Sequence, residues 1–121
     1  MAETTKMRTR IVVFLPAPAT LPQFLHVDNV ITDLVLIADG ATYSKDIDPV
    51  FVGRWLDTVA YVVKTDQIMI VVADTIIPQK SSNLLHLLSR IKVRSQADLG
   101  QDIVWITLQD VSRVSTHDYI R

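Results

Sequence analysis

The chain has 121 residues, a net charge of −1 and no cysteine. This length is typical of one domain, and the near-neutral charge provides no general attraction to phosphate backbones or anionic membranes. The lack of cysteine excludes disulfides, thiolate metal sites and cysteine nucleophiles. No apolar run approaches the ~20 residues that a membrane helix needs. We therefore expect a cytoplasmic protein without membrane insertion.

The composition favours strands and turns. Val, Ile and Thr together make up about a third of the chain, and these β-branched residues suit strands. The acids are twelve Asp and a single Glu. Because Asp suits caps and turns while Glu suits helix interiors, both counts predict a β-rich domain.

The first part of the chain predicts two strands. A strand over residues 10–15 ends at Pro16, because proline cannot donate a ladder hydrogen bond. Residues 23–27 predict a short helical turn. A second strand over residues 33–38 ends at Asp39, which glycine follows as a turn signal.

Residues 50–64 allow two interpretations. Asp48, followed by proline, is a good helix start. The many β-branched residues and Gly53 instead favour two short strands, which we prefer. Residues 64–66 would then be the turn that leads into a strand over residues 67–72.

The second half contains the main predicted helix, over residues 81–90, with a serine as its N-cap. Ile91 and Val93 alternate with basic residues, as in a half-exposed strand. A further strand is expected over residues 103–108, and a last short strand begins near Val111.

We expect residues 1–9 to be a flexible N-terminal tail, residues 10–115 a single globular domain, and residues 116–121 a loose C-terminal tail. A shift of 60 residues aligns His26 with His86 and Gly40 with Gly100. A true repeat would give two related halves, but coincidence between two β-rich segments is the preferred interpretation.

The preferred fold is α+β and β-rich, with a mostly antiparallel, small-barrel-like sheet and one main helix. The alternative is a four-stranded α/β sandwich with a parallel sheet. It is favoured by nearly all-apolar strand runs, which suit a sheet buried on both faces. Its four strands would be residues 10–15, 33–38, 67–72 and 103–108.

Catalytic motifs are missing from the sequence. Its three glycines are scattered, so they form no phosphate loop or dinucleotide fingerprint. It contains no HExxH or GxSxG pattern. We therefore expect no catalytic residue, metal or cofactor, and favour a non-enzymatic role.

Four residues are candidates for ligand binding. Asp39 and Asp74 each follow an apolar run that ends in Ala, and acids at strand ends can line a crevice. His26 and His86 each follow a leucine and would form a symmetric pair. The preferred interpretation, however, is that the acids are turn residues and the histidines are half-buried structural groups.

Two further groups are candidates for macromolecular contacts. Arg54, Trp55 and Trp105 are candidate interface residues, because Trp and Arg are enriched at interface hot spots. The basic residues between Lys80 and Arg94 could bind nucleic acid. Because acids follow them closely in sequence, a solvated surface is preferred.

Three functions follow from these observations. The first is a non-enzymatic interaction or assembly module that associates with itself or another protein, because its apolar content is high for a small domain. The second is a small ligand-binding domain or enzyme that uses Asp39 and Asp74. The third, less favoured, is a nucleic-acid binder.

Overall fold

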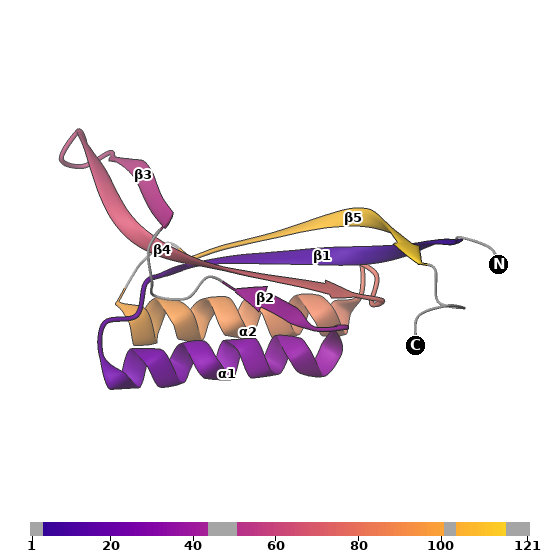
Figure 1. The fold of residues 1–121 in the computed structure, drawn as a ribbon. Helices are drawn as coiled ribbons and strands as arrows, with labels where there is room; N and C mark the ends of the chain where they lie inside the picture. The colour runs from indigo at the N-terminus through magenta and orange to yellow at the C-terminus, as the bar shows by residue number, and fades with distance from the viewer. Residues whose placement is uncertain (1–3, 44–50, 101–103, 116–121) are drawn as a thin grey trace.

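The computed structural model describes residues 4–43, 51–100 and 104–115. The expected helix start at Asp48 and the expected tail over residues 116–121 lie outside these ranges. Two helices lie against one face of a sheet (Figure 1). The elements in chain order are β1 (Thr4–Pro16), α1 (Leu21–Ile37), β2 (Ala41–Tyr43), β3 (Phe51–Asp57), β4 (Val62–Thr75), α2 (Ser82–Leu99) and β5 (Trp105–Ser115).

The sheet has the order β2-β4-β1-β5, and β3 also pairs with β4. Every pairing among the described strands is antiparallel. With β2 and β3 both serving as the second strand, the chain follows the β-α-β-β-α-β order of ferredoxin-like folds. The α+β, mostly antiparallel prediction is confirmed. The parallel alternative is wrong, and the sheet is open rather than barrel-like.

Side chains of β1 and β4 alternate between two faces. Those that point to the helices are buried and form the centre of the core: Ile11, Val13, Leu15, Met69, Val71 and Ala73. Their neighbours on the other face, such as Val12 and Phe14, are only half-buried. The core therefore lies between the sheet and the two helices.

Helix α1 replaces the strand expected over residues 33–38. It begins with a capping box, in which Thr20 accepts from the backbone of Gln23 and the Gln23 side chain accepts from the backbone of Thr20. Leu34 is fully buried whereas Leu36 is 78% exposed, as a helical period requires. Packing against the sheet overrides the β preference of the residues in this helix.

Helix α2 begins where it was predicted and is longer than predicted. Ser81 caps it, and the left-handed Gly100 ends it with a φ of 66°. Residues around Ile91 and Val93, expected to form a strand, continue the helix. Its buried face has helical spacing throughout: Leu84, Leu88, Ile91, Ser95 and Leu99. The prediction of one main helix is therefore corrected to two.

The preferred strands within residues 50–64 are confirmed as β3 and the start of β4. The turn between them lies at residues 58–61, where Tyr61 has a φ of 60°. Residues 64–66, expected to be a turn, continue β4 instead. Asp, Thr and Lys at those positions resemble a turn in composition, but their backbone pairs with β3.

Strands β1 and β5 extend beyond their expected ends. β1 includes residues 4–9, which were expected to be a tail, and Thr4 pairs with Ser115 at the far end of β5. The 60-residue shift also aligns Val12 with Val72. Val12 and Val72 are cross-strand partners in the two central strands, and each of these strands leads into a helix.

Leu34→Ala is expected to lower the free energy of unfolding by about 2–5 kcal/mol, because it leaves a cavity beneath α1. Leu36→Ala should change it by less than about 0.5 kcal/mol. Urea denaturation of both variants measures the difference. Equal losses would contradict the helix, since a strand would place both side chains on the same face.

Candidate interaction surface and polar clusters

The open face is the side of the sheet opposite the helices (Figure 1). Directly paired residues of an antiparallel sheet share a face, so the register places its side chains in rows across three strands. The rows are Ile70–Phe14–Trp105, Val72–Val12–Thr107 and Asp74–Arg10–Gln109. The first two rows are mainly apolar.

Trp105 lies at the β5 end of the first row, where 61% of its surface is exposed. It is one of the three predicted interface residues. Arg54 is exposed on β3, and Trp55 lies beside it in the same strand, but its side chain lies outside the described part of the structure. The predicted interface residues therefore belong to two separate elements.

Two pairs of strands extend past the part of the sheet that the helices cover (Figure 1). The β3–β4 hairpin carries Val59 and Tyr61, which are 95% and 82% exposed. At the other end, β1 and β5 continue as a ribbon beyond the end of β4 and carry the exposed Met7 and Val114. Isolated two-stranded ribbons have little stability, which makes the exposed apolar side chains of both arms candidate interaction surfaces.

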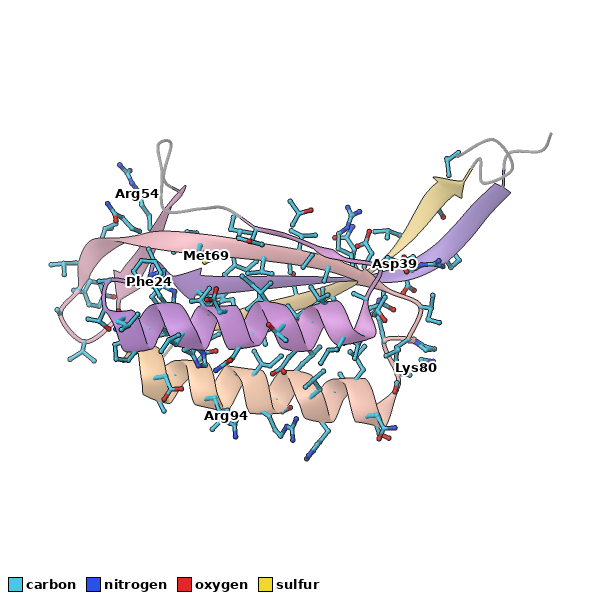
Figure 2. All side chains as sticks on the ribbon, turned by 60° about the horizontal axis from the view of Figure 1, so that its bottom comes forward. Phe24, Asp39, Arg54, Met69, Lys80 and Arg94 are labelled. Carbon is cyan, nitrogen blue, oxygen red and sulfur yellow. The ribbon has the colours of Figure 1, made fainter. Side chains whose placement is uncertain are left out.

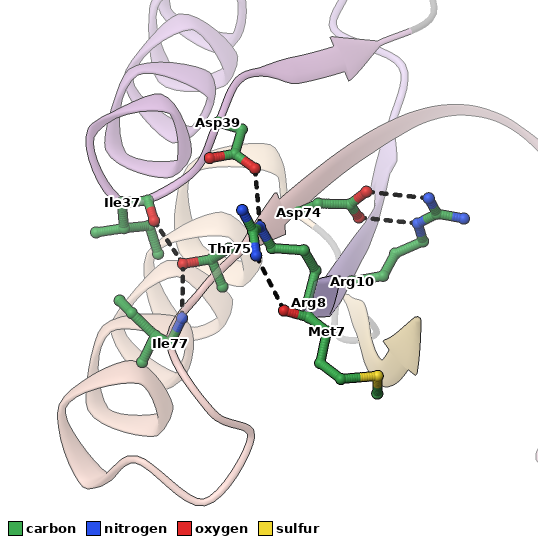
Figure 3. A network of polar contacts seen from close by, with 8 residues as sticks. All are labelled: Met7, Arg8, Arg10, Ile37, Asp39, Asp74, Thr75 and Ile77. Carbon is green, nitrogen blue, oxygen red and sulfur yellow. Dashed lines mark hydrogen bonds and ion pairs between the residues drawn. The ribbon is translucent and has the colours of Figure 1, made fainter. Parts of the chain in front are cut away.

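The candidate acids Asp39 and Asp74 lie close together, and each is paired with an arginine (Figure 3). The Asp39 backbone N–H donates to the Asp74 carbonyl over 3.0 Å. Arg10 binds both carboxylate oxygens of Asp74, at 2.8 and 3.0 Å, and Arg8 Nε lies 3.0 Å from Asp39 Oδ2.

These ion pairs limit what the two acids can do. The hydrogen bond and negative charge of Asp74 raise the pKa of the Arg10 guanidinium above its usual value. A metal ion or a proton would have to compete with the arginines. Within the described residues, no group of three His, Cys, Asp or Glu side chains could hold a metal ion. The cluster is therefore better suited to joining strands than to acid–base chemistry.

Thr75 completes this cluster from inside the core. Its hydroxyl donates to the Ile37 carbonyl at the end of α1 and accepts from the Ile77 backbone N–H (Figure 3). Thr75 is fully buried, so this bond satisfies a carbonyl that the helix end leaves without an intrahelical partner. Nothing in the local sequence distinguishes Thr75 from other strand threonines.

The structure separates the two candidate histidines. His26, on α1, is buried between two residues of α2: its Nδ1 lies 2.9 Å from Asp98 Oδ2 and its Nε2 lies 2.8 Å from Ser95 Oγ. His86 is exposed near the start of α2. The step of nine positions from His86 to Ser95 corresponds to about 14 Å of helix.

The connection from Asp98 through His26 to Ser95 resembles that of a hydrolase triad. A carboxylate only accepts, so Nδ1 of His26 donates to Asp98, and Nε2 shares a hydrogen bond with the Ser95 hydroxyl. Ser95 is fully buried, however, which leaves its hydroxyl out of reach of a substrate. The three side chains therefore act as a polar connection between the helices.

The basic residues lie on the helix layer. Lys80 precedes α2, and Arg94 lies on this helix (Figure 2). Arg90 and Lys92 are exposed on the same helix. Trp105 lies on the open face, on the other side of the sheet. The basic group and this tryptophan therefore do not form the combined charged and stacking surface that a single-strand binder uses.

The chain matches no protein-family model and no curated protein sequence. Among solved structures it is similar to a phage SAM lyase in complex with S-methyl-5′-thioadenosine, with a TM-score of 0.61 and 10% identity over 94% of this chain and 93% of that chain. CutA1 from Oryza sativa has a TM-score of 0.54 and 15% identity over 92% and 86% of the two chains. At such identities the likeness establishes the fold alone. No described helix has the length and apolar character needed to span a bilayer.

His26→Ala is expected to lower the free energy of unfolding by about 2–3 kcal/mol, because it opens a cavity and removes the partner of the buried Ser95 hydroxyl. His86→Ala is the matched control and should cost less than about 0.5 kcal/mol. Thermal or urea denaturation measures both. Similar small losses would show that the interhelical connection contributes little.

Proposed function

We propose that this chain is a non-enzymatic assembly module that associates with further copies of itself through its open face. The observation that carries this proposal is an apolar sheet face that no described element covers, with Trp105 61% exposed at its edge. We place the module in the cytoplasm, because the chain has no cysteine and disulfides are rare in that reducing compartment.

The pattern of β1 supports burial of this face. An antiparallel sheet with one face in water normally alternates apolar and polar residues. The central segment of β1, residues 11–15, is apolar at every position, so both faces of the strand avoid water. Burial of a large aromatic side chain such as Trp105 stabilises an interface by about 2–3 kcal/mol.

A second copy of the chain is a suitable occupant for two reasons. The charged row of the open face pairs Arg10 with Asp74, so the face presents no net charge from these residues and two copies would not repel each other there. The β3–β4 and β1–β5 arms also extend from the helix-covered sheet and expose apolar side chains. A neighbouring copy would supply the packing that such ribbons need.

Trp105→Lys is expected to weaken self-association, because it places a charge in the apolar row that includes Phe14. Leu36→Lys is the matched control, since Leu36 is 78% exposed on the helix layer. Sedimentation and native mass spectrometry should show multiples of the 13.6 kDa chain for the original protein and the control, and a shift to the monomer for Trp105→Lys.

Circular dichroism of all three proteins verifies that the folded state is retained. A monomeric original protein would refute the proposal. So would a Trp105→Lys variant that keeps its full oligomeric mass. A monomer that carries a bound small molecule would instead favour the ligand-binding alternative.

A further inference from the structure

A groove between α1 and α2 encloses about 280 Å³. Its lining includes the apolar side chains of Val30, Leu87 and Ile91, and its rim includes exposed residues of both helices. Ligand pockets usually measure about 300–1,000 Å³, so this groove suits only a small molecule. Its volume corresponds to about nine waters, or a ligand with a similar number of non-hydrogen atoms.

Charges of opposite sign line the two walls of the groove. Arg90 and Arg94 lie one turn apart on α2, and Asp33 lies on α1. Among the residues that the structure describes, none of these three takes part in an ion pair within 4.0 Å. The other acid of the lining, Asp98, is already bound to His26. The two guanidinium groups and the Asp33 carboxylate can therefore form ion pairs with a ligand.

We propose that this groove binds a small zwitterion of the size of an aliphatic amino acid. The arginines would bind the ligand carboxylate, since a guanidinium matches carboxylate geometry with two parallel hydrogen bonds. Asp33 would bind the ammonium group. The short apolar side chain would pack against Val30 and Ile91.

The groove and the open face lie on different layers of the molecule. Arg94 is on the helix layer, whereas self-association would bury the side of the sheet opposite the helices (Figure 2). Ligand binding therefore does not depend on the proposed assembly. The monomeric Trp105→Lys variant should bind the ligand as the original protein does, which separates the two proposals.

Three small molecules test the chemistry of the site. L-leucine carries both charged groups, 4-methylpentanoate lacks the ammonium group and 3-methylbutylamine lacks the carboxylate. Titrations followed by ¹H–¹⁵N correlation spectra should show leucine shifting the amides of the groove on both helices. The other two should bind at least about tenfold more weakly than leucine. Equal binding of leucine and 4-methylpentanoate, or no shifts in the groove with leucine, would overturn the proposal.

Arg94→Gln and Asp33→Asn should each weaken leucine binding about tenfold or more, because each removes one of the charges that the ligand pairs with. Lys92→Gln is the matched control, since Lys92 is exposed on α2 and does not line the groove. It should leave binding unchanged. Unchanged binding in Asp33→Asn, or an equal loss in Lys92→Gln, would refute the site.

Discussion

Strands β1 and β4 carry apolar side chains on both faces, and both helices lie on the same side of them. This arrangement determines where the core lies and which side of the sheet remains open. The covered side forms the core around Val13 and Val71, which are fully buried. On the opposite side Val12, Phe14 and Val72 are only half-buried, and one row of side chains ends at the exposed Trp105. This opposite side is the surface through which we propose that copies of the chain associate.

Polar contacts at separate places hold the layers in register. Thr75 binds the end of α1 to β4, and Arg10 joins β1 to β4 through Asp74. His26 connects α1 with the last turns of α2. The candidate ligand residues Asp39, Asp74 and His26 are thus occupied by structural hydrogen bonds and ion pairs. Arg90, Arg94 and Asp33, which have no ion pair among the described residues, lie elsewhere, along the interhelical groove.

The central strands could be predicted because residues 10–15 and 67–72 are short apolar runs rich in β-branched residues. Helix α1 could not, because its β-branched residues have the local preference of a strand and only their packing against the sheet decides otherwise. The candidate site residues likewise divide into those that local sequence predicts and those that depend on packing. The type and size of Trp105 predict an interface residue, whereas the environments of His26 and His86 depend on how the two helices pack. That packing brings Ser95 and Asp98 to His26 and leaves His86 exposed. Residues far apart in sequence bring about that difference.

The pairing of the first strand with the last has a consequence for how the chain is made. Thr4 pairs with Ser115, so β1 gains its outer neighbour only after the chain has been synthesised as far as β5. Until then its apolar residues have only β4 beside them, which is itself made late. Contacts of such long range slow folding, and an unpaired apolar edge is prone to aggregation during that interval. The order of strands thus makes the growing chain more vulnerable than the finished protein.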